Sequence, residues 1–145
     1  MPDKPKRRDQ GEYMRGRMRT QSAHSRELVC PDPIDPVRRG NCERSLKLFL
    51  LTYLATEFYM TWSPDHEKVV QKLEDAILIG GNFAEAMPRG SGKTTIAEGA
   101  AIWMTVNGLR RFPVLIGANK DAAIQILENI KAHLANNDLL YADYP

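Results

Sequence analysis

The feature that most constrains this chain is a glycine-rich stretch, EAMPRGSGKTTIAEG, that runs from Glu85 to Gly99. Glycines between an apolar segment and a helix-forming segment let the backbone curl until successive N–H groups point at one anion. The Gly-Lys-Thr sequence at the start of the helix adds an ammonium and a hydroxyl group. The stretch therefore predicts a phosphate-binding loop over residues 87–95, with a strand before it and a helix after it.

Each part of this loop has an expected contact with a nucleotide. We expect the ammonium of Lys93 to reach the β- and γ-phosphates of ATP, and the hydroxyl of Thr94 to bind a Mg²⁺ ion. Thr95 is expected to reach the α-phosphate. The predicted cofactors are therefore ATP and Mg²⁺. The predicted cofactor-binding residues are Arg89, Gly90, Ser91, Gly92, Lys93, Thr94 and Thr95.

The loop departs from the usual pattern in two ways. The position of the first glycine holds Met87, and the proline after it can supply the bend that this glycine normally gives. Arg89 lies inside the loop, where a guanidinium would neutralise charge that builds on the transferred phosphoryl group. We therefore expect Lys93 and Arg89 to be the catalytic residues. The alternative is that Arg89 is a surface residue that pairs with Glu85 or Glu98.

Hydrophobic periodicity and capping residues predict four helices. Asn41 is the expected N-cap of the first, while the second has Ser63 as its N-cap and Pro64 at its first position. The apolar stripe of the first helix consists of Leu46, Phe49, Leu50, Tyr53 and Leu54. The inward-facing residues expected in the last helix are Ala123, Ile126, Leu127, Ile130 and Leu134. The predicted ranges are 42–54, 64–79, 93–107 and 120–137.

Two short segments have the composition of strands. Residues 82–87 precede the loop, and the compact apolar run 113–117 is typical of a buried parallel strand. The order strand, loop, helix, strand, helix predicts a right-handed βαβ unit, and therefore an α/β fold.

The N-terminal part differs in composition from the rest. The net charge of the chain is only +2, but basic residues gather at its start, namely Lys4, Lys6, Arg7, Arg8, Arg15, Arg17 and Arg19. Residues 1–27 are predicted to be a disordered basic arm, which is either a solvated tail or an arm that binds nucleic acid. Residues 28–41 contain three prolines and are expected to form an extended connector.

The sequence gives little support for a membrane helix, a signal peptide, a disulfide bond or a zinc site. No apolar run reaches the roughly 20 residues of a membrane helix, and the first ten residues are too polar for a signal peptide. Cys30 and Cys42 lack the spacing of a zinc site, and two reduced thiols are favoured over a disulfide. The expected location is the cytoplasm, with no membrane partner.

The stretch AMPRGSGKTT, followed by FPVLIGANKDAAIQILENI, resembles the ATPase domain of the large terminase subunit of tailed phages. In that family the phosphate loop often carries an arginine and lacks its first glycine. The residues that match position by position are Arg89, Gly92, Lys93 and Thr94. The resemblance covers residues 26–145 and implies ATP-driven packaging of double-stranded DNA into a procapsid, in the host cytoplasm. It also implies a small terminase subunit and a portal as partners.

The resemblance also implies a fold. Residues 42–145 would form the N-terminal part of a three-layer P-loop NTPase domain with a parallel sheet, preceded by helices. In the implied strand order the segments 82–87 and 113–117 are not neighbours, so the sheet is expected to be incomplete in this chain. No apolar run ending in Asp-Glu is present to orient the attacking water. We therefore expect ATPase activity in a full-length protein, but not a complete catalytic site in these 145 residues alone.

Upstream of the loop, related ATPases place an aromatic residue and a glutamine that contact adenine. Trp62 and His66 are the candidates for this contact here, although no glutamine stands at that position. The residues favour a second interpretation, in which Trp62 is half-buried packing and His66 lies on a helix surface. Two other functions also remain open, which are a helicase-like ATPase acting on nucleic acid and a non-catalytic nucleotide-binding or assembly module.

Overall fold

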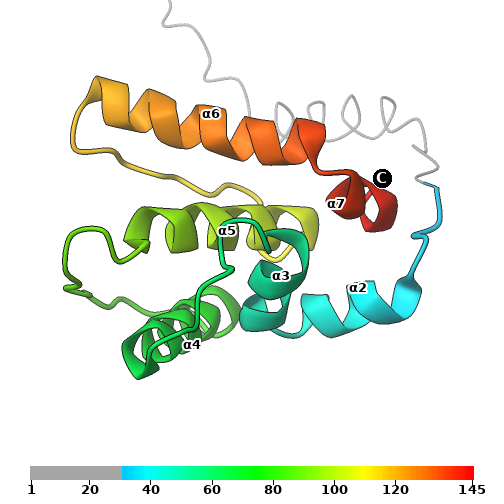
Figure 1. The fold of residues 1–145 in the computed structure, drawn as a ribbon, viewed down its shortest axis with the longest axis horizontal. Helices are drawn as coiled ribbons and strands as arrows, with labels where there is room; N and C mark the ends of the chain where they lie inside the picture. Colours follow the sequence, from blue (N-terminus) through cyan, green and yellow to red (C-terminus); the bar gives the residue numbers. More distant parts are fainter. Residues whose placement is uncertain (1–30) are drawn as a thin grey trace, which may run out of the picture. The chain divides into compact units, whose positions relative to one another are not determined.

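Six α-helices and the segments between them make up residues 31–145, the part of the chain that this computed structural model describes. Residues 32–145 form one unit, and the expectations for the arm of residues 1–27 lie outside the described residues. The helices are α2 (Pro36–Glu43), α3 (Leu46–Tyr53), α4 (Pro64–Leu78), α5 (Lys93–Val106), α6 (Lys120–Asn136) and α7 (Asp138–Asp143) (Figure 1).

The prediction of an α/β P-loop NTPase fold with a parallel sheet is wrong for residues 31–145, which contain no strand. The two predicted strands, residues 82–87 and 113–117, run as irregular chain before and after α5 (Figure 1). A strand needs a neighbour for its N–H and C=O groups, and these segments exchange no hydrogen bond with each other. Two strands alone would in any case form a marginal sheet. The apolar composition of a strand is present here without a pairing partner.

The predicted extended connector over residues 28–41 becomes helical at Pro36. Asp35 caps α2, because its carboxylate accepts a hydrogen bond from the Arg38 N–H at 2.8 Å. Pro36 then fills the first helical position, where no N–H donor is needed. The sequence analysis treated this proline as a residue of extended chain, whereas an acidic residue followed by proline is a helix start.

The first predicted helix is divided into α2 and α3, so the N-cap expected at Asn41 is wrong. Asn41 lies inside α2, and Ser45 caps α3 instead by accepting from the Leu48 N–H. The predicted apolar stripe is confirmed, since Leu46, Phe49, Leu50, Tyr53 and Leu54 are all buried. The predicted start of α4 is also confirmed, with Ser63 as N-cap and Pro64 at the first position.

Helix α5 lies at the centre of the unit. It packs against α3 and α4 on one side and against α6 on the other (Figure 1). Trp103 of α5 is fully buried, and its indole N–H donates to the Cys42 carbonyl at 2.9 Å, which ties α5 to the end of α2. Burial of an apolar side chain of this size stabilises the fold by about 1.5–3 kcal/mol. The loop before α5 is therefore carried by the most deeply packed helix.

Helix α6 does not bury the face that its sequence predicts. None of its residues is buried, and Leu127 and Leu134 are 50% and 44% exposed. The face expected to point inward would have packed on a sheet, and the described residues form no sheet. Only the edge of α6 that faces α5 is therefore covered. The preceding segment is similarly open, with Val114 66% and Ile116 89% exposed. The prediction that this run is a buried strand is therefore wrong.

A buried ion pair joins the two ends of the unit. Asp143 of α7 is fully buried and accepts from the Arg38 guanidinium at 2.6 and 2.9 Å, from the Tyr53 hydroxyl at 2.7 Å, and from the Asp35 N–H at 3.0 Å. Burial by itself would raise the pKa of Asp143, but the bonds from Arg38, Tyr53 and Asp35 outweigh it and lower the pKa. Asp143 is therefore held as a carboxylate.

No helix among the described residues is long and apolar enough to cross a membrane. Cys42 is a free, buried thiol in the core, and Cys30 lies outside the described residues.

Candidate phosphate-binding site

The loop before α5 has the backbone geometry of an anion-binding turn. Gly90 and Gly92 have φ angles of 79° and 74°, in the left-handed region that other residues rarely adopt. A Cβ at either glycine would meet nothing within 4 Å, so the backbone angle, not crowding, requires glycine here. Ser91 lies between them, and its hydroxyl donates to the Pro88 carbonyl at 2.8 Å. Such tight turns bring successive N–H groups toward one concave side.

The start of α5 adds more donors to this loop. Gly92 is the N-cap and offers no side chain to the first turn, unlike the Asp, Ser and Asn residues that cap the other described helices. The N–H groups from Ser91 to Thr95 have no acceptor within residues 31–145, and the first paired one is Ile96 N–H, which donates to the Gly92 carbonyl at 2.9 Å. A helix start with free donors carries partial positive charge and favours an anion.

Lys93 bends back over the loop. Its ammonium donates to the carbonyls of Met87 and Pro88, both at 2.6 Å. The charge is therefore held at the loop rather than released into solvent. Thr94 is exposed and Thr95 partly buried, and no hydrogen bond of either hydroxyl occurs within the described part of the chain. The structure thus brings the predicted ammonium, hydroxyl groups and loop amides together at one helix end.

Arg89 is exposed at the tip of the loop and forms no ion pair with any described residue. Both acidic residues considered as its partners are bonded elsewhere. Glu85 pairs with Lys72 at 2.8 Å, and Glu98 accepts from the Asn129 side chain at 3.0 Å. The guanidinium is consequently free to meet a ligand held by the loop.

A cavity of about 310 Å³ opens beside the loop. Its lining includes Phe58, Trp62 and His66, together with Gly90, Ser91 and Gly92 of the loop. Trp62 is half-buried, with its ring centroid 5.5 Å from that of Phe58 and 5.9 Å from the Lys47 ammonium. Trp62 and His66, the candidate adenine contacts, both line this cavity, and Trp62 is half-buried as its packing interpretation predicts.

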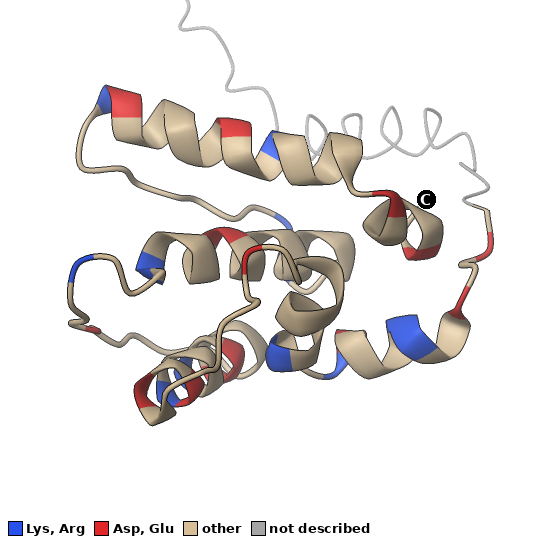
Figure 2. Cartoon of the chain, in the orientation of Figure 1, with Lys and Arg blue, Asp and Glu red and all other residues tan. Residues whose placement is uncertain are grey.

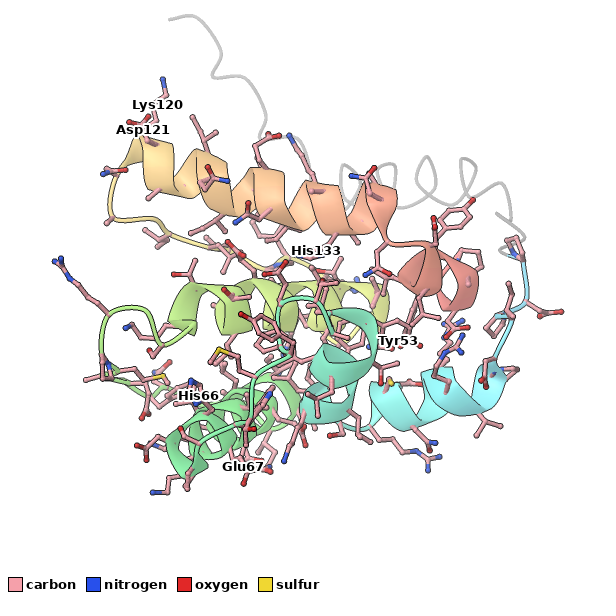
Figure 3. The ribbon with its side chains drawn as sticks, viewed as in Figure 1. Tyr53, His66, Glu67, Lys120, Asp121 and His133 are labelled. Atoms are coloured by element: carbon pink, nitrogen blue, oxygen red, sulfur yellow. The ribbon has the colours of Figure 1, made fainter. Side chains whose placement is uncertain are left out.

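Both ring nitrogens of His66, which is labelled on α4 in Figure 3, have partners in the protein. Nδ1 lies 2.7 Å from the Ser63 hydroxyl and 3.3 Å from the Ser63 N–H, while Nε2 lies 2.9 Å from the Ser91 carbonyl oxygen. His66 therefore connects the first turn of α4 to the middle of the loop. The sequence analysis did not predict this contact, because residues 66 and 91 are related only through the fold.

The cavity beside the loop has one carboxylate in its lining, Glu57, and α5 itself carries little charge. Helix α5 carries one basic residue, Lys93 at its start, and one acidic residue, Glu98 (Figure 2). Glu98 is only 5% exposed and points to Asn129 of α6 instead of lining the cavity. Burial raises its pKa, although the bond from Asn129 opposes that shift. Within the described residues, no carboxylate cluster stands ready to hold a metal ion without a nucleotide.

Comparisons with known proteins give no relative. No protein-family model matches the chain, and searches of curated proteins and of solved structures also found no match. The resemblance of residues 26–145 to large terminase subunits therefore stays a prediction from the sequence.

Proposed function

We propose that this chain binds Mg²⁺–ATP at residues 87–95. The observation that carries the proposal is the loop itself, in which two left-handed glycines and the uncapped start of α5 present unpaired N–H groups beside the Lys93 ammonium. These features together are selective for a group of high negative charge, because each is a donor or a cation.

Individual residues would then have separate roles. The amides of Gly90 to Thr95 hold the phosphates, and Lys93 leaves its carbonyl partners to neutralise the β- and γ-phosphates. Thr94, exposed in the first turn, is placed to bind the magnesium ion that shields the phosphate charge. Trp62 presents an aromatic surface in the adjoining cavity, where a nucleobase would stack.

For the biological role we propose a terminase-type DNA-packaging ATPase, acting on double-stranded DNA in the host cytoplasm with a small terminase subunit and a portal. The resemblance of AMPRGSGKTT to the atypical loop of that family supports this assignment, and Arg89 is the residue that distinguishes it from a common phosphate loop. A helicase-like ATPase and a non-catalytic nucleotide-binding module are the competing functions, and ATP turnover that depends on packaging separates both from the proposal.

Calorimetric titration with Mg²⁺–ATP, Mg²⁺–ADP and AMP tests the binding proposal. The N–H groups of Ser91 to Thr95 are unpaired within the described residues and lie at the start of α5, so we expect ATP and ADP to bind at least tenfold more tightly than AMP, which lacks the β-phosphate. Equal affinity for all three ligands, or no heat with any of them, would contradict a phosphate site at this loop.

Arg89→Ala should change the dissociation constant for Mg²⁺–ATP by no more than about threefold, because this exposed side chain has no contact that shapes the loop. In the full-length protein, turnover in a DNA-packaging assay should fall much more than affinity, since a guanidinium at the transferred group acts on the transition state. A rise in KM with unchanged kcat would instead make Arg89 a ground-state binding residue. Arg110→Ala is a suitable control, because Arg110 is exposed and follows the far end of α5.

A further inference from the structure

We propose that His66 is a positioning residue that fixes the phosphate-binding loop through the carbonyl of Ser91. The expected effect of His66 on nucleotide affinity rests on the proposed function. The effect of the imidazole on the order of the loop can be tested without any nucleotide.

The hydrogen-bond partners of His66 define which nitrogen carries the proton. The Ser91 carbonyl oxygen, 2.9 Å from Nε2, can only accept, so Nε2 must donate. The Ser63 backbone N–H, 3.3 Å from Nδ1, can only donate, so Nδ1 must have a free lone pair. The neutral imidazole with its proton on Nε2 is the one form that satisfies both partners.

His66 occupies the N3 position of α4, where a capping box normally has glutamate or glutamine. Its Nδ1 performs the usual task of that residue, which is to accept from the N-cap N–H of Ser63. A glutamate would do this equally well, but its carboxylate could not donate to the Ser91 carbonyl. Histidine therefore provides a second bond that helix capping alone does not require.

The bond to Ser91 acts on a part of the loop that needs restraint. The peptide unit that joins Ser91 to Gly92 has glycine on its C-terminal side, and a second glycine, Gly90, precedes Ser91. Glycine leaves the backbone free to rotate on that side, so local conformation restrains this unit less than it would between two non-glycine residues. Since the peptide is planar and trans, holding the Ser91 carbonyl toward His66 turns the Gly92 N–H to the opposite side, away from His66.

No other side chain from outside residues 87–95 hydrogen-bonds to this loop within the described part of the chain. The remaining loop bonds are internal, from Ser91 and Lys93 to the carbonyls of Met87 and Pro88. Loss of the His66 bond would therefore leave the loop attached mainly through its two chain ends. His66 thereby pre-organises the donors that face the phosphates, so that the loop loses less conformational freedom when a ligand binds.

Three substitutions separate this role from helix capping. His66→Gln offers an amide that can accept from Ser63 and donate to Ser91. His66→Glu keeps the capping box and loses only the bond to Ser91, whereas His66→Ala loses both. Thermal unfolding reports on the cap. Trypsin cleavage after Arg89, measured without nucleotide by mass spectrometry, reports on the order of the loop.

We expect His66→Glu to be cleaved after Arg89 about two- to tenfold faster than the wild type, which corresponds to one lost hydrogen bond. Its Tm should stay close to that of the wild type, and His66→Gln should match the wild type in both measurements. Cleavage after Arg111, which is exposed beyond α5, should be the same in all variants and serves as the internal control. Wild-type cleavage rates in His66→Glu and His66→Ala would overturn the inference, as would a His66→Gln variant with a normal Tm and a fast-cleaved loop.

Nucleotide titration then connects the loop to the proposed function. We expect His66→Glu and His66→Ala to bind Mg²⁺–ATP more weakly than His66→Gln. If the wild type binds no nucleotide while the cleavage pattern holds, the proposed function fails and the positioning role stands. If nucleotide binds and the cleavage pattern is absent, the positioning role alone is wrong.

Discussion

Replacing Lys93 with alanine should weaken the binding of Mg²⁺–ATP by about 10- to 100-fold, because a charge-assisted hydrogen bond is worth about 1.5–3 kcal/mol. The ammonium is the side-chain cation that the structure holds inside the loop, at 2.6 Å from two loop carbonyls. These carbonyls belong to Met87 and to the exposed Pro88, so the substitution should affect binding more than folding. Calorimetry gives the affinity, and thermal unfolding shows whether the fold is kept.

The chain offers a matched control in Lys120→Ala. Lys120 is the first residue of α6 just as Lys93 is the first residue of α5, and it points away from the rest of the unit (Figure 3). Helix α6, however, is capped by Asn119, whose side chain accepts from the Ala122 N–H at 2.8 Å, and no glycine loop precedes it. Lys120→Ala should therefore bind nucleotide as the wild type does. Equal binding by Lys93→Ala and the wild type would show that the loop is not a phosphate site.

Local features of the sequence predicted α4, α5 and α6, although they missed α2 and the division between α2 and α3. Caps act over three residues, so Ser63 marks the start of α4 without knowledge of the fold. The apolar stripe from Leu46 to Leu54 is likewise a property of one helix, and it is buried as predicted. Gly90 and Gly92 belong to the predicted loop, and both have left-handed φ angles that favour glycine.

Strands and long-range polar contacts could not be predicted in the same way. The run 113–117 has the composition of a buried strand, but a strand exists only if another segment pairs with it, and no local pattern shows whether one does. The predicted burial of α6 depended on that sheet, so this prediction is wrong for the same reason. The bond between His66 and Ser91 joins residues on separate elements, so neither their spacing in the sequence nor their residue types could predict it.

The contact between Arg38 and Asp143 is the clearest example of this limit. No role was predicted for Asp143 from the sequence. Its partner, Arg38, lies 105 positions earlier in the chain. A fully buried carboxylate with four donors can be recognised only from coordinates. It also explains why the short helix α7 is held at all, since Leu140 is its only buried apolar residue.

Asp143→Ala should lower the free energy of unfolding by about 3–5 kcal/mol, the usual cost of removing one partner from a buried ion pair. The substitution leaves the partly buried Arg38 guanidinium and the buried Tyr53 hydroxyl without their acceptor. Urea unfolding followed by circular dichroism measures the loss. Asp138→Ala is the matched control, because Asp138 is an exposed carboxylate on the same helix, and we expect a cost below about 1 kcal/mol there.

Two further measurements separate the ion pair from simple loss of packing. In the double variant Arg38→Ala with Asp143→Ala, no guanidinium is left unpaired, so the total cost should be smaller than the sum of the two single costs. The pKa of Asp143 is lowered in the folded state, so its contribution is fully present above the ordinary pKa of an aspartate, 3.8. It is lost as the pH falls through the lower pKa of the folded state. The stability difference between wild type and Asp143→Asn should therefore stay constant near neutral pH and shrink only in acid below that value. A difference that is additive in the double variant and unchanged in acid would mean that Asp143 stabilises the fold by its volume and not by its charge.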